Sequence, residues 1–102
     1  MLYSVNMKES KVEAHFKWQV ARLGGKTYKF TSPAQRGVAD QIACLPNGET
    51  WFVELKAPSG RLSKLQELFA EDMELLGQRY ACLWSIEQIN EWVESLGAEW
   101  LH

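Results

Sequence analysis

The chain has 102 residues, of which 46% are hydrophobic and 24% are charged, a composition typical of one globular domain. The length leaves no room for a second hydrophobic core, and no apolar run is long enough for a membrane span or a secretion signal. We therefore expect a single cytoplasmic domain over residues 1–102. Cys44 and Cys82 lie in apolar stretches without a CxxC pair, which argues against a disulfide scaffold or a zinc finger and favours reduced core cysteines.

Charge is unevenly distributed along the chain, although the formal net charge is only -2. Residues 1–66 carry ten of the eleven basic residues against five acids, whereas residues 67–102 carry one basic residue against eight acids. The stretch from Ala14 to Ala39 has no acid and holds five basic residues: Lys17, Arg22, Lys26, Lys29 and Arg36. This pattern suits a polyanionic partner, and a solvated basic face balanced by acidic helices is an equally simple alternative.

The first predicted element is an amphipathic helix over residues 8–23. Apolar residues recur there at helical spacing, at Val12, Phe16, Val20 and Leu23, and Gly24 and Gly25 end the pattern. Residues 26–31 contain Thr, Tyr and Phe and are typical of a strand, and a loop over residues 32–37 follows them.

A β-hairpin is the clearest local pattern in the chain. Two strands, residues 40–45 and 50–56, flank the turn Pro46-Asn47-Gly48, and Asn-Gly supplies the positive φ angles that a tight turn requires. A register centred on Asn47 places Asp40 opposite Glu54. Strand alternation then divides the side chains into one face with Asp40, Ile42, Cys44, Phe52, Glu54 and Lys56, and another with Ala43, Leu45, Trp51, Val53 and Leu55. Both faces carry apolar residues, so we expect helices on both sides of a mixed sheet.

Helix and strand alternate over the rest of the chain. Residues 58–60 break the hairpin strand, and Ser63 starts a helix that ends at Gly77 and whose apolar stripe is Leu65, Leu68, Phe69, Met73 and Leu76. Residues 79–84 form the next strand, and Ser85 starts a final helix that Gly97 ends. The element order is αβββαβα, an α/β fold in which we expect the apolar stripes and most of the five tryptophans to serve packing.

Asp40, Glu54 and Lys56 do not fit a purely structural role. Strand interiors disfavour acids, and a carboxylate on a covered sheet face is costly unless a partner compensates it. Two carboxylates directly across a ladder repel each other, whereas a divalent metal ion converts that repulsion into coordination by hard oxygen ligands. Lys56 adds a cation where a phosphate oxygen would lie, so the three residues suit metal-assisted phosphodiester hydrolysis. The alternative is an exposed Glu54–Lys56 pair on an edge strand, with Asp40 capping the preceding loop.

These residues lie in a longer pattern that resembles the virus-type replication-repair nuclease (VRR-NUC) domain of the PD-(D/E)xK nuclease superfamily. The pattern comprises Lys29-Phe30-Thr31-Ser32-Pro33, Arg36-Gly37-Val38-Ala39-Asp40, Phe52 through Ser63, and Gln66. The resemblance runs from Glu9 to about Glu91 and implies a restriction-endonuclease-like fold. It departs from many members at Ala39, where they have a proline that would make the backbone before Asp40 more rigid.

The resemblance implies a role for each matching residue. Asp40 and Glu54 would bind Mg²⁺ or Mn²⁺ together with the backbone carbonyl of Leu55, and Lys56 would orient the attacking water. Glu13 would support the metal site from the first helix, although it can equally form a helical i,i+4 pair with Lys17. Gln66 matches a glutamine that follows the core motif, and it is also placed to complete a capping box with Ser63. His15 is expected to be a surface or packing residue.

The resemblance also implies a substrate and an assembly. The expected substrate is DNA, held at its phosphates by Lys17, Lys29, Arg36, Arg61 and Lys64, with no organic cofactor and no membrane. Small stand-alone relatives are homodimers that resolve four-way (Holliday) junctions, so we expect a dimeric junction resolvase. The alternatives are a flap or nonspecific nuclease, a non-catalytic nucleic-acid-binding module, and a protein-interaction role through the acidic helices.

Overall fold

The computed structural model describes residues 4–32 and 34–97 and contains three helices and four strands in these ranges. In chain order they are α1 (Ser4–Arg22), β1 (Lys26–Lys29), β2 (Gln41–Cys44), β3 (Thr50–Leu55), α2 (Lys64–Leu75), β4 (Arg79–Leu83) and α3 (Ile86–Ser95). The predicted order αβββαβα is confirmed. Helix α1 begins four residues before the predicted start. The tail at residues 98–102 lies outside the described residues.

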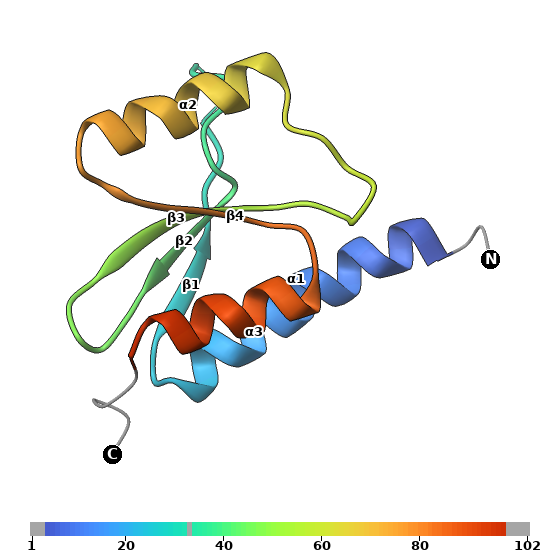
Figure 1. The fold of residues 1–102 in the computed structure, drawn as a ribbon, viewed down its shortest axis with the longest axis vertical. Coiled ribbons are helices and arrows are strands. Elements are labelled where there is room, and N and C mark those ends of the chain that lie inside the picture. The colour runs from blue at the N-terminus through green and yellow to red at the C-terminus, as the bar shows by residue number, and fades with distance from the viewer. Residues whose placement is uncertain (1–3, 33, 98–102) are drawn as a thin grey trace.

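The sheet is mixed, as expected, with the strand order β1-β2-β3-β4. Strands β1, β2 and β3 are antiparallel neighbours, and β4 lies parallel to β3. Helix α2 provides the connection between the two parallel strands and lies on one side of the sheet, whereas α1 and α3 lie together on the other side (Figure 1). Both faces therefore have helical cover, as both apolar faces of the hairpin predicted.

The hairpin has the predicted register. Gln41 pairs with Val53 and Ile42 with Phe52, so the same register places Asp40, one residue before β2, opposite Glu54. The turn differs from the prediction in one detail, because Gly48 has a φ of 90° while Asn47 has no positive φ. The Asn47 side chain instead accepts a hydrogen bond from the backbone N–H of Glu49 at 3.0 Å. One left-handed residue is enough for this three-residue turn.

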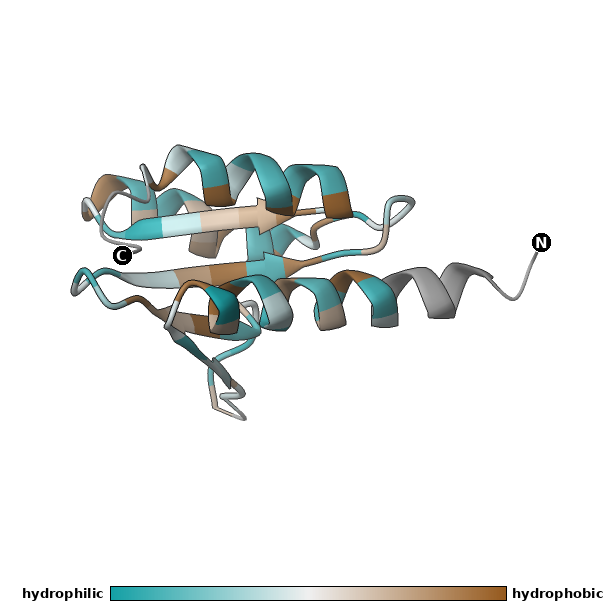
Figure 2. Ribbon diagram, turned by 90° about the horizontal axis from the view of Figure 1, so that it is seen from below, coloured by the Kyte–Doolittle hydropathy of each residue, from teal (hydrophilic) through white to brown (hydrophobic). Residues whose placement is uncertain are grey.

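The main hydrophobic core lies between the sheet and the α1–α3 pair. The predicted face of the hairpin contributes Ala43, Leu45, Val53 and Leu55, and the predicted stripe of the first helix contributes Val12, Phe16, Val20 and Leu23, all of them buried. Helix α3 adds Ile89, Trp92 and Val93. Over the parts coloured in Figure 2, each helix carries both hydrophilic and hydrophobic residues, as expected for amphipathic helices that cover a sheet.

Helix α2 has less contact with the sheet than its sequence predicts. Ser63 caps its start in a complete capping box, but the helix has no buried residue. Phe69 stacks edge-on against Phe52 and Tyr80, whereas Leu65, Leu68 and Leu76 of the predicted stripe are 47%, 42% and 67% exposed. The expectation that the whole stripe packs in the core is therefore wrong. The helix packs on the sheet through Phe69, and an apolar stripe in the sequence does not reveal how much of it will be covered.

Two smaller expectations about packing also need correction. Cys44 and Cys82 are free thiols, as predicted, but both are only partly buried. Trp18 is 57% exposed on α1, unlike the buried Trp92. Within the described ranges, none of the helices combines the length and the apolar character needed to cross a bilayer.

Candidate active site

Asp40 and Glu54 form the centre of the site at the open end of the hairpin. Glu54 is only 4% exposed, and Asp40 lies at the entrance of β2, where its backbone carbonyl accepts a hydrogen bond from Phe30 at 2.9 Å. The backbone N–H of Leu55 donates to Oδ1 of Asp40 at 3.3 Å and so connects the Asp40 carboxylate to the residue that follows Glu54. The hairpin thus brings both predicted carboxylates together.

The electrostatics of this pair favour a cation. Burial, and after it the neighbouring negative charge of Asp40, raise the pKa of Glu54 to about 7 against the opposing effect of Lys56. Burial also raises the pKa of Asp40, partly offset by the hydrogen bond from Leu55. The raised pKa values show that the positive charge of Lys56 does not fully compensate the two carboxylates.

Lys56 and Gln66 both contact the Glu54 carboxylate. The Lys56 ammonium lies 3.7 Å from Oε2 of Glu54 and is 20% exposed, and the Gln66 amide donates to the same oxygen at 3.1 Å. The Gln66 side-chain oxygen accepts from the backbone N–H of Ser63 at 2.8 Å, and the Ser63 hydroxyl accepts from the backbone N–H of Gln66 at 3.1 Å. Gln66 therefore closes the capping box, as the sequence predicted, and also reaches the site from α2.

Glu13 approaches the site from α1 on the other side of the sheet. Its Oε2 lies 3.3 Å from Lys17 and 3.5 Å from Lys29, and it accepts a hydrogen bond from the Gln41 amide at 3.4 Å. Burial raises the pKa of Glu13, but Lys17 and Lys29 outweigh this effect and hold the pKa below its ordinary value, while the charge of Glu13 raises the pKa of Asp40. Glu13 thus makes the helical pair with Lys17 and is also coupled electrostatically to the metal-ligand candidate.

The donor set fits a divalent metal ion that prefers oxygen. Asp40 and Glu54 offer hard carboxylate ligands with raised pKa values, which a cation would lower again. In residues 4–32 and 34–97, no three His, Cys, Asp or Glu side chains gather in a way that could hold a metal ion. A bound ion would therefore need further oxygens from the backbone, water or a substrate phosphate, a ligand mixture that Mg²⁺ commonly accepts.

The five predicted phosphate-binding residues are all exposed. Lys17 on α1 and Lys29 on β1 share Glu13, whereas Arg36 precedes Asp40 in the loop. Arg61 and Lys64 flank the start of α2, the helix that carries Gln66. His15 shares a hydrogen bond with Asn90 of α3, which agrees with the expected packing role.

Two residues near the site were missed by the sequence reasoning. Gln41 is 1% exposed and bridges toward Glu13, and strand alternation could have revealed it as a polar residue on the core face. Trp84 follows β4 and donates its indole N–H to the carbonyl of Gly60 at 3.0 Å. No local sequence signal links Trp84 to that loop, because the contact depends on the parallel pairing of β3 with β4.

Comparison with known proteins gives two matches. The chain is 43% identical over 60 residues to "Putative nuclease p44" of Acyrthosiphon pisum secondary endosymbiont phage 1; the match covers 59% of this chain and 64% of that protein. A solved structure described as a VRR_NUC domain superposes with a TM-score of 0.80 at 27% identity, covering 85% of this chain and 95% of the other. No protein-family model matches the chain.

Proposed function

We propose that this chain, which has the fold of the VRR-NUC domain, is a nuclease of that kind and acts as a divalent-metal-dependent DNA endonuclease. The observation that carries the proposal is the pairing of Asp40 with the buried Glu54, with Lys56 and Gln66 on the same Glu54 oxygen. A structural ion pair would not require a second carboxylate opposite a buried one. The arrangement is instead suited to holding a cation.

Each residue has a task that follows from its position. Asp40, Glu54 and the carbonyl of Leu55 would hold Mg²⁺ or Mn²⁺, which when bound supplies charge neutralisation and a water of lowered pKa. Gln66 restrains the Glu54 carboxylate by a direct hydrogen bond. Lys56 has its ammonium beside Glu54 and can donate to the attacking water or to a phosphate oxygen. Glu13, with Gln41 and Lys29, positions the α1 side of the site.

The DNA backbone would lie across the exposed basic residues named above. Contacts from Lys17, Lys29, Arg36, Arg61 and Lys64 to phosphates contribute affinity without reading the base sequence. This favours selection of DNA by its shape, and we propose a branched substrate, in particular a four-way junction.

A homodimer suits such a symmetric substrate, since two sites related by a two-fold axis can cut two strands. Helix α2 offers an apolar surface for a second copy, with Leu68, Leu75 and Leu76 exposed by 42%, 84% and 67%. Burial of these side chains in a dimer would remove apolar area from water. Sedimentation of wild type and of Leu75→Glu/Leu76→Glu tests the dimer: the wild type should sediment as a dimer and the variant as a monomer.

A cleavage panel tests the activity and the substrate. Purified protein is offered junction, flap and plain duplex DNA with Mg²⁺, with Mn²⁺ and with EDTA, alongside Glu54→Ala and the control Glu94→Ala on the exposed surface of α3. We expect metal-dependent cutting of the junction, lost in Glu54→Ala with DNA binding kept. Preferred cutting of flaps or duplex would replace the junction assignment, and binding without cutting under any condition would indicate a non-catalytic module.

A further inference from the structure

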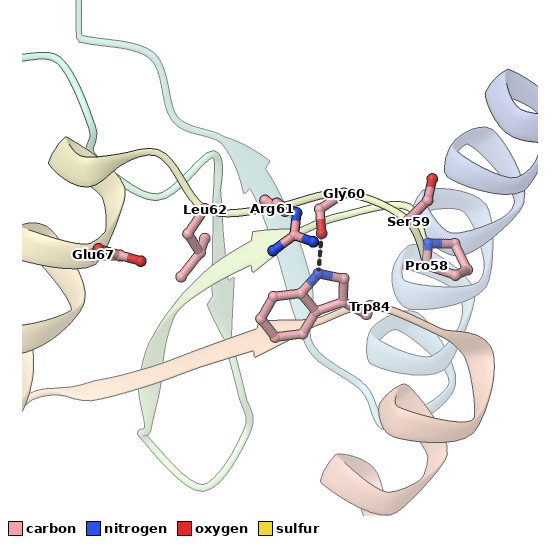
Figure 3. Close-up of a pocket in the computed structure, with 7 residues that line it drawn as sticks. All are labelled: Pro58, Ser59, Gly60, Arg61, Leu62, Glu67 and Trp84. Atoms are coloured by element: carbon pink, nitrogen blue, oxygen red, sulfur yellow. Dashed lines mark hydrogen bonds between the residues drawn. The ribbon is translucent and has the colours of Figure 1, made fainter.

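A cavity of about 720 Å³ lies beside the candidate active site and has no role in the chemistry described above. It is lined by the loop after β3, the first turn of α2 and the residue after β4: Pro58, Ser59, Gly60, Arg61, Leu62, Glu67 and Trp84. Figure 3 shows the Arg61 guanidinium pointing toward the Trp84 indole, with Glu67 at the far side on α2. The size falls within the range of small-molecule and cofactor sites.

Two contacts connect this cavity to the catalytic lysine. The Trp84 indole N–H donates to the Gly60 carbonyl at 3.0 Å, so the edge of the ring is fixed to the loop (Figure 3). A Cβ added to Gly60 would lie 3.4 Å from Cβ and from Cδ of Lys56, which places this part of the loop directly against the Lys56 stem. A ligand in the cavity would therefore lie close to the Lys56 side chain.

The lining combines three kinds of chemistry that match a nucleotide. The partly buried indole of Trp84 offers a planar apolar surface, the exposed Arg61 offers a cation, and the Glu67 carboxylate offers hydrogen-bond acceptors. Nucleobases stack on aromatic side chains irrespective of sequence, and guanidinium groups bind phosphates. A carboxylate accepts hydrogen bonds from the exocyclic amino group of cytosine or adenine but would repel a phosphate.

We propose that this cavity receives an unpaired nucleobase of the DNA strand next to the cleavage position. The base stacks on Trp84, its neighbouring phosphate contacts Arg61, and its polar edge faces Glu67. The inference rests on the proposed function, because it assumes that DNA reaches Lys56. It adds a reason for preferring branched DNA, since a paired base in regular duplex is not free to enter a side cavity.

The test is a comparison of two DNA substrates and four proteins. Binding of a four-way junction is measured by fluorescence anisotropy in EDTA, with intact DNA and with abasic sites replacing the bases at the branch point. The proteins are wild type, Trp84→Leu, Trp84→Phe and the control Trp18→Leu, which removes an exposed tryptophan elsewhere. Thermal denaturation accompanies each variant to confirm folding.

We expect wild type and Trp18→Leu to bind the abasic junction roughly tenfold more weakly than the intact one, and Trp84→Leu to bind both equally weakly. Trp84→Phe keeps an aromatic ring but loses the N–H, and it should retain most of the difference in affinity between the intact and the abasic junction. A general structural defect would weaken binding of both DNAs by the same factor and leave the ratio of the two affinities as it is in wild type. A wild-type ratio near one, or the same ratio in wild type and Trp84→Leu, would overturn the proposal.

The binding test and the cleavage panel described above, run on the same intact and abasic junctions, together separate this inference from the nuclease assignment. Metal-dependent cleavage with no effect of abasic sites would reject the base cavity and leave the nuclease intact. If abasic sites weaken binding only in proteins that keep Trp84, and no DNA is cut with any metal ion, the cavity would be supported and the catalytic role rejected.

Discussion

Two glutamates of one hairpin show how position determines what a carboxylate does. Glu49, at the turn end, accepts a hydrogen bond from the Trp51 indole at 2.9 Å and pairs with Arg79 at 3.5 Å, with its side chain 27% exposed. Glu54, at the open end, has a side chain only 5% exposed and faces a second acid, with its ammonium partner at 3.7 Å. Protein neighbours compensate the charge of the Glu49 carboxylate. The Glu54 carboxylate lies opposite another acid, and a bound metal ion would stabilise its ionised form. The two should therefore respond differently to the same substitution.

Glu54→Gln should have the largest effect on activity. The amide keeps the shape and the neighbouring contacts but removes the negative charge that would hold the metal ion, so we expect cleavage to fall by roughly 10³-fold or more. The measurement is single-turnover cleavage of the preferred DNA substrate in Mg²⁺. Glu49→Gln provides the matched control and should cleave at close to the wild-type rate. Equal losses in the two variants would contradict the assignment of Glu54.

Lys56→Met should have the next largest effect. The methionine preserves most of the aliphatic stem that packs beside Gly60 but removes the ammonium, and we expect a loss of roughly 10²-fold in the cleavage rate. Lys26→Met, at an exposed position on β1 outside the proposed phosphate-binding residues, is the control for general loss of positive charge. A rate within a factor of three of wild type would show that the ammonium takes no part in the reaction.

The stability of the metal-free protein should depend on pH through Glu54. Its pKa is raised from 4.5 to about 7 in the folded chain, so the folded state binds this proton more tightly than the unfolded state does. The contribution of Glu54 to stability is therefore present at low pH and is lost as the pH rises through 7. Relative to Glu54→Gln, wild type in EDTA should become less stable by about 1–3 kcal/mol between pH 4.5 and pH 7.5.

Urea denaturation of both proteins across this pH range measures that difference. The Gln variant cancels the contributions of the other titrating groups, since they are present in both proteins. Addition of Mg²⁺ at pH 7.5 should raise the stability of wild type and leave the variant nearly unchanged. A constant difference between the two proteins across the range would contradict the burial argument.

Glu49→Gln should have the smallest effect, and on stability alone. Its ion pair with Arg79 is half exposed on the arginine side, and such pairs contribute about 0.2–1 kcal/mol. The remaining amide oxygen can still accept the Trp51 hydrogen bond. We expect the free energy of unfolding in urea to fall by less than about 1 kcal/mol and to vary little with pH. A larger fall would show that the Glu49 charge stabilises the turn end more than a half-exposed ion pair does.

Local patterns in the sequence were sufficient to predict the hairpin and the placement of its two carboxylates. The turn residues Asn47 and Gly48 determined the register, and the two-residue alternation of strands then placed Asp40 opposite Glu54 and directed Val53 and Leu55 to the core. The capping box at Ser63 and Gln66 was equally readable, because both of its contacts lie within four residues. The cleavage activity and the metal ion were inferred from these residues and from the resemblance, and they remain predictions.

Only the tertiary structure decided which distant residues meet these local elements. Gln66 contacts Glu54, Gln41 contacts Glu13, and Trp84 contacts Gly60, and each pair is joined through packing between separate elements. The tertiary structure also determines the exposure of Leu68 and Leu76. An amphipathic helix can be recognised from its local sequence, but the extent of the surface that will cover it cannot. Periodicity and turn preferences act over a few residues. The contacts between distant residues depend on how all the elements pack around the core, and this packing cannot be read from the spacing of residues in the sequence.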